Sequence, residues 1–139
     1  MAELFAFEAH TPCRLFFKDR VQAVTLTLQD GEIGILARHE DITARVKSCL
    51  LKIKGGDGRW QTAFASEGIL EVAGGKTVFM ADSAEWPEEI DRDRALEAKR
   101  QAEAVLQTPS FRFEAENARL RLERAEMRLK AWALKTRQA

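Results

Sequence analysis

Residues 30–42, DGEIGILARHEDI, combine carboxylates, two glycines and His39, one of the two histidines in the chain. Such a mixture could form a catalytic loop, a phosphate-binding loop or a turn that contacts another molecule. A catalytic loop needs a nucleophile beside its base, and a phosphate-binding loop needs a helix N-terminus directly after it. The segment supplies neither. The sequence therefore favours a contacting turn, with Asp30-Gly31 at the turn and Gly34 at a close approach within a strand.

The common catalytic and ligand-binding motifs are absent from the sequence. No serine lies in GxSxG, and neither a Walker sequence nor GxGxxG occurs. Cys13 and Cys49, taken with His10 and His39, lack zinc-ligand spacing. The two cysteines are predicted to be small apolar residues in a reducing compartment. We therefore predict no enzyme activity, no metal and no required cofactor.

Composition narrows the class of protein further. The chain has 139 residues, of which 45% are hydrophobic and 32% charged, so one domain with a small appendage is expected. Formal net charge is +0, which gives no electrostatic case for nucleic acid or for an anionic membrane surface. No apolar run approaches the roughly 20 residues of a membrane span. The N-terminus lacks the features of a signal peptide, so a soluble protein is expected.

The first part of the chain predicts short strands separated by turns. Apolar and polar residues alternate in VTLTL (24–28) and LKIK (51–54), as they do in half-buried strands. The turn sequences GGDG and AGG are followed by RWQTAF and KTVFMA, which predicts two hairpins. Many short strands without a helical period between them predict an antiparallel sandwich or barrel, which we place in residues 1–86.

The second part, residues 87–139, predicts two helices. Pro87 and the acidic residues after it are typical of a helix start, and the composition of residues 90–106 favours a helix. Its apolar stripe is Ala95, Ala98, Ala102 and Val105. Pro109 ends this helix, and Ser110 is a candidate cap for the next. The second helix carries an apolar heptad pattern of Phe111, Ala115, Ala118, Leu122, Ala125, Leu129 and Trp132. We expect an antiparallel hairpin whose alanine-rich contact is weak and can open.

The second helix is locally basic. Its charged residues are Arg112, Arg119, Arg121, Arg124, Arg128, Lys130, Lys135 and Arg137 against Glu114, Glu116, Glu123 and Glu126. Two interpretations stay open. The residues could form a solvated helix face with ion pairs four residues apart, or a docking surface for an acidic partner or a phosphate.

Taken in chain order, these features resemble the epsilon subunit of F-type ATP synthases. The most specific matches are GEIGIL (31–36) with His39, GILEV (68–72), ADSA (81–84), and Ile90-Asp91 with Arg94-Ala95. The resemblance covers nearly the whole chain. It implies a mixed, mainly β fold: an antiparallel sandwich of about ten strands followed by an antiparallel two-helix hairpin.

The resemblance also implies a function. Members of this family are non-catalytic components of the central rotor, bound to the gamma subunit and in contact with the c-ring. They couple proton translocation to ATP synthesis at the cytoplasmic face of the bacterial membrane, which they meet only through the complex. Their hairpin can extend into the catalytic head, where a basic second helix meets an acidic loop of the beta subunits and hinders ATP hydrolysis.

In some bacterial members the folded hairpin also binds regulatory ATP. The resemblance carries that site to Glu85, Ile90, Asp91, Arg94, Ala95, Arg124 and Arg128. Two arginines four residues apart share a helix face and can fork around phosphate oxygens. The open alternative is that Asp91 caps the helix and that Arg94, Arg124 and Arg128 make surface ion pairs.

By the same resemblance, Glu32, Arg38 and His39 contact the rotor. The family usually continues this loop as Leu-Pro-Gly-His-x-Pro-Leu, whereas residues 36–42 are LARHEDI. Both prolines and one glycine are lost, which predicts a less rigid, more charged turn that meets a partner with compensating changes. A second departure is Glu67, where the family commonly has glycine.

Two further functions remain as alternatives. The chain could be a free ATP-sensing protein whose hairpin closes on nucleotide, which an ATP-dependent rise in thermal stability would reveal. It could also be a scaffold that dimerises through its heptad pattern, against which a monomeric mass would argue.

Overall fold

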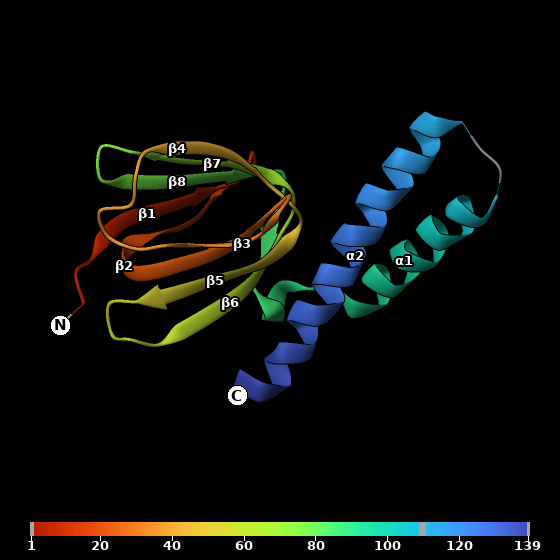
Figure 1. The fold of residues 1–139 in the computed structure, drawn as a ribbon. Coiled ribbons are helices and arrows are strands. Elements are labelled where there is room, and N and C mark those ends of the chain that lie inside the picture. Colours follow the sequence, from red (N-terminus) through yellow and green to blue (C-terminus); the bar gives the residue numbers. More distant parts are fainter. Residues whose placement is uncertain (1, 109–110, 139) are drawn as a thin grey trace.

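The computed structural model describes residues 2–108 and 111–138, which form a β-sandwich followed by a helical hairpin (Figure 1). The strands are β1 Phe5–His10, β2 Leu15–Leu28, β3 Gly31–Ile35, β4 Ile42–Val46, β5 Cys49–Gly55, β6 Trp60–Ala65, β7 Gly68–Ala73, β8 Lys76–Ala81 and β9 Ala84–Glu85. They are followed by the 3-10 helix η1 Pro87–Glu89 and by α1 Arg92–Gln107 and α2 Arg112–Gln138. The expected mainly β fold with a C-terminal hairpin is confirmed.

The long strand β2 joins the layers of the sandwich. It pairs with β1, β3, β4 and β5, while β1, β8, β7 and β4 lie in sequence across one layer. Nine strands lie within the described residues, against the ten or so expected. All pairings are antiparallel except that of β1 with β8, which is parallel, a pairing that no local sequence pattern indicates.

Alternating side chains fill the space between the layers. Burial alternates residue by residue along β1 and along most of β5, as the sequence pattern predicts. The largest fully buried side chains include Phe7, Leu51, Leu70 and Phe79. Each such side chain stabilises the fold by about 1.5–3 kcal/mol. Both predicted hairpins form, β5 with β6 and β7 with β8.

Two expectations about small residues need correction. Gly34 is not a close-approach position, because a methyl group added there would meet no atom within 4 Å. The close approach falls instead at Gly68, against the backbone of β8. Cys49 is buried as expected, and its burial raises the pKa of its thiol, but Cys13 is exposed.

Asp91 is the N-cap of α1, since its side chain accepts a hydrogen bond of 3.1 Å from the backbone N–H of Arg94. The chain before it forms the short helix η1 and then the extended, buried Ile90, so the regular helix begins later than the acidic cluster suggests. Pro109 and Ser110, the predicted stop and cap, lie outside the described residues. No helix in the described part of the chain is long and apolar enough to cross a membrane.

The two helices pack through alanines, as the apolar stripes predict. Ala95 and Ala102 of α1 are buried, as are Ala118 and Ala125 of α2. The stripes do not stay buried to the end of the hairpin, because Phe111 is 81% exposed. The central part of the heptad pattern is thus used within one chain, which leaves little of it for dimerisation.

The helix α2, rather than α1, lies against the sandwich (Figure 1). Ala131 of α2 is fully buried with Phe64 of β6 and Ile90, and Met127 and Trp132 pack at the edge of this cluster. The heptad pattern does not contain Ala131. Ala131 belongs to a second face of α2, which is directed at the sandwich and which the sequence pattern did not indicate.

Arg38 has a left-handed backbone conformation, with φ at 66°, at the position where the related family has glycine. This conformation costs a residue other than glycine about 1 kcal/mol. Arg38→Gly is therefore expected to be more stable than Arg38→Ala by about 1 kcal/mol in urea unfolding. Both variants lose the ion pair of Arg38 with Glu3, which is exposed and contributes little. Equal stability of the two would show that the loop is unstrained.

Candidate functional site

Two arginines of α2 lie at the junction between the hairpin and the sandwich. Arg124 and Arg128 are four residues apart, so they share one face of the helix. Their side chains are only 31% and 27% exposed. Guanidinium groups held in this way can bind carboxylates or phosphates through paired hydrogen bonds.

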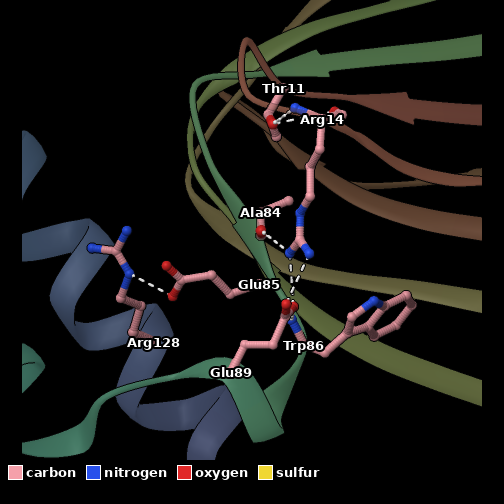
Figure 2. A network of polar contacts seen from close by, with 7 residues as sticks. All are labelled: Thr11, Arg14, Ala84, Glu85, Trp86, Glu89 and Arg128. Atoms are coloured by element: carbon pink, nitrogen blue, oxygen red, sulfur yellow. Dashed lines mark hydrogen bonds and ion pairs between the residues drawn. The ribbon is translucent and has the colours of Figure 1, made fainter.

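Arg128 is held by the last strand of the sandwich. Its Nε donates to Oε1 of Glu85 at 3.0 Å (Figure 2). Its Nη2 lies 3.4 Å from the hydroxyl of Ser83. The guanidinium also covers the ring of Phe64, with 4.5 Å from Cζ to the ring centroid. This contact over the aromatic face adds to the ion pair.

Arg124 binds a second carboxylate of the sandwich. It donates through Nη2 and through Nε, at 3.1 Å for the latter, to the two oxygens of Glu67, and it lies 3.3 Å from Oδ2 of Asp82. The hydroxyl of Ser48 donates to the same Glu67 at 2.9 Å. Partial burial of Glu67 disfavours its charged form, but the hydrogen bonds from Arg124, its own backbone and Ser48 outweigh this and lower the pKa. The hydrogen bonds to Glu67 also raise the pKa of Arg124.

Two cavities adjoin these arginines. One, of about 360 Å³, is lined by Glu85, Glu89, Asp91, Arg94, Ala95, Ala98 and Arg128. The other, of about 700 Å³, lies between α1 and α2 and also reaches Ala98 and Arg128, so the two cavities share these walls. Arg124 lines the larger cavity but not the smaller one. The arrangement offers anion-binding groups, and no cluster of metal-binding side chains occurs among the described residues.

The seven residues predicted for ATP are only partly brought together. Glu85, Asp91, Arg94, Ala95 and Arg128 line the smaller cavity, and Arg124 lines its neighbour. Ile90 lines neither cavity and is buried in the cluster under α2. The alternative is present in part: Asp91 caps α1, and Arg124 and Arg128 pair with carboxylates of the sandwich. No ion pair of Arg94 occurs among the described contacts.

Of the three residues predicted for the rotor contact, Arg38 and His39 are neighbours in the chain, whereas Glu32 lies at the other end of β3. Glu32, near the start of β3, borders a cavity that Met127 and Lys130 of α2 also line. Arg38, beyond the other end of β3, pairs with Glu3 near the N-terminus, which Figure 1 places on the side of the sandwich away from the hairpin. His39 donates through Nδ1 to the carbonyl oxygen of its neighbour Glu40, at 2.7 Å.

A separate polar network attaches the linker to the sandwich. Arg14 donates two hydrogen bonds to Glu89, at 2.8 and 2.7 Å, and a third of 3.2 Å to the carbonyl of Ala84 (Figure 2). Glu89 also accepts from the backbone N–H of Trp86 at 2.8 Å, while the ring of Trp86 stacks on Phe16. No sequence motif indicated Arg14, because its partner is 75 residues away.

The Arg14 pair predicts a pH-dependent contribution to stability. The hydrogen bonds from Arg14 lower the pKa of Glu89 below its ordinary value of 4.5, so the pair stabilises the fold above that pH and is lost as the pH falls through the lowered value. Glu89→Gln should therefore unfold at lower urea concentration than the parent at pH 7, with the gap closing below pH 4.5. Glu88→Gln, at an exposed neighbour with no described ion pair, is the control and should show no such gap. A gap that is constant with pH would contradict the assignment.

Comparison with known proteins places both parts of the chain in one family. The family model "ATP synthase, Delta/Epsilon chain, beta-sandwich domain" matches residues 4–87. The model "ATP synthase, Delta/Epsilon chain, long alpha-helix domain" matches residues 88–133. The two matches follow each other directly and cover the sandwich and most of the hairpin.

Individual relatives and solved structures agree. The ATP synthase epsilon chain of Caldicellulosiruptor saccharolyticus is 48% identical over 86% of this chain and 88% of its own. That of Caldicellulosiruptor bescii is 46% identical over 94% of this chain and 93% of its own. A chain of the mitochondrial ATP synthase of Euglena gracilis shares the fold, with a TM-score of 0.78 and 24% identity over 92% of this chain and 80% of that one. The chain belongs to the ATP synthase delta/epsilon family, where its similar relatives are epsilon chains.

Proposed function

We propose that this chain works as a non-catalytic epsilon subunit in the central stalk of an F-type ATP synthase, at the cytoplasmic face of a bacterial membrane. The observation that carries the proposal is the 48% identity to an ATP synthase epsilon chain over 86% of this chain. The absence of a paired nucleophile and base in the sequence is consistent with a coupling role.

The proposed partners are the gamma subunit, the c-ring and, when the hairpin extends, an acidic loop of the catalytic beta subunits. Support for the last partner comes from α2, on which Arg119, Arg121, Lys130 and Lys135 are exposed and not committed to ion pairs within the described residues. An acidic segment would be attracted to this helix, and salt would weaken the attraction. We expect residues 1–86 and 87–139 to act as separate units.

Reconstitution with the cognate gamma subunit tests the proposal. The chain should co-purify with gamma in equal amounts, and the assembled complex should hydrolyse ATP more slowly than a complex with the chain ended after residue 86. Failure to bind gamma would overturn the assignment of partner. Equal hydrolysis rates would overturn the inhibitory role alone.

The smaller cavity favours a regulatory nucleotide site as a second element of the function. Arg94 and Arg128 face it and could hold phosphate oxygens, while Asp91 keeps its cap on α1. Three carboxylates, those of Glu85, Glu89 and Asp91, line this cavity together with the two arginines. The negative and positive charges balance because Arg14, which lies outside the cavity lining, pairs with Glu89. A polyphosphate would therefore have to displace Glu85 from Arg128.

Titration with ATP tests the site directly. Binding to the folded chain must raise the free energy of unfolding, by about 2.7 kcal/mol at an ATP concentration 100 times the Kd, and the thermal unfolding midpoint must rise with it. Arg128→Ala should lose most of this effect. No change in midpoint at millimolar ATP would remove the nucleotide site from the proposal and leave the central-stalk role intact.

A further inference from the structure

Glu67 of the sandwich accepts hydrogen bonds from two donors of Arg124. Both carboxylate oxygens accept from the guanidinium, through Nη2 and through Nε at 3.1 Å, so the contact is side-on and bidentate. A phosphate group would use the same two donors. A carboxylate of the chain therefore occupies the groups that an anionic ligand needs.

The position of Glu67 is fixed by its surroundings. It lies between β6 and β7, next to Ser66, which is fully buried. The N–H of Ser66 donates to the carbonyl of Ser83, and the N–H of Ser83 donates to the hydroxyl of Ser66, each at 2.9 Å. The buried Ser48 donates to the carboxylate at 2.9 Å. A carboxylate held in this way loses little conformational entropy when it binds the arginine, which makes the pair stronger than an exposed one.

The contact joins the two parts of the chain. Glu67 belongs to the sandwich and Arg124 to α2, 57 residues later. Among the described residues, the apolar contact at this junction is the small cluster of Phe64, Ile90 and Ala131, with Leu50, Met127 and Trp132 packed at its edge. With so little apolar burial, a partly buried ion pair is a large share of what keeps the hairpin in place.

We propose that Glu67 is a built-in ligand of Arg124, which holds the hairpin on the sandwich in the absence of nucleotide. This docking does not depend on the nucleotide site proposed above.

The position of the hairpin in the full-length chain tests this proposal. Spin labels at Thr43→Cys in β4 and Arg119→Cys in α2, in a Cys13→Ser background, report the distance between sandwich and helix by pulsed electron resonance. Without ATP, Glu67→Gln is expected to lower the ratio of docked to undocked hairpin by roughly tenfold. Glu71→Gln, at an exposed carboxylate without a described ion pair, should leave it unchanged.

A double substitution separates the pair from a general loss of charge. Once Arg124→Ala has removed the partner, adding Glu67→Gln should change docking no further. An unchanged docking ratio in Glu67→Gln, or a full additional loss in the double variant, would overturn the proposal.

Discussion

Replacing Gly68 by alanine is expected to destabilise the sandwich by more than about 3 kcal/mol. A methyl group at this position would lie 2.9 Å from the Cα atom of Ala81 and closer still to the carbonyl oxygen of Met80. These are backbone atoms of β8, so no side-chain rotation can make room. Moving β8 away would strain its pairing with β1 as well as with β7. Thermal unfolding of the variant should begin on the order of 10 °C lower.

Gly34→Ala provides the matched control for this effect. The strand β3 places Gly34 opposite Thr25 of β2, and a methyl group there would meet no atom within 4 Å. The substitution restricts the unfolded chain, so it should be neutral or stabilising by up to about 1 kcal/mol. If the two alanine variants unfolded at the same temperature, the close approach of β8 would not be the reason that position 68 requires glycine.

The parts of the fold that depend on local pattern could be predicted from the sequence. Alternation in residues 51–54 predicted β5, and the GGDG turn predicted its hairpin with β6. The alanine stripes predicted the contact between the helices, because a period of 3.6 residues specifies a helix face. Arg124 and Arg128 were singled out by the resemblance to the epsilon family, and their spacing of four residues predicted that they share a helix face.

The parts that depend on contacts between distant segments could not be predicted. The parallel pairing of β1 with β8 and the ion pair of Arg14 with Glu89 leave no local trace. Glu67 did stand out, as a charged residue where the related family has glycine. Its meaning required the structure, because only the fold places it beside Arg124. Gly34 was misassigned since sequence alone cannot tell which face of a glycine meets another strand.

The substitution with the largest expected effect on the hairpin is Ala131→Glu. Ala131 is fully buried between Phe64 and Ile90, so a longer side chain has no space and its charge would lose its water. Without a partner for the carboxylate, docking would cost about 3 kcal/mol or more, enough to make the undocked hairpin the major state. The distance between labels on β4 and α2 should lengthen accordingly. Ala104→Glu, at an exposed position of α1, should leave this distance unchanged.

In the assembled complex, Ala131→Glu tests whether undocking of the hairpin changes the rate of ATP hydrolysis. An undocked hairpin is free to reach the catalytic head, so under the proposed inhibitory role Ala131→Glu should slow ATP hydrolysis and make the rate insensitive to added Glu67→Gln. The reason is that both substitutions act on one equilibrium, and the first has already displaced it. Hydrolysis at the parent rate, with a lengthened distance between the labels, would show that an undocked hairpin does not by itself inhibit the enzyme. Inhibition would then require a specific contact between the basic face of α2 and the head, which changing the exposed Arg121 would detect.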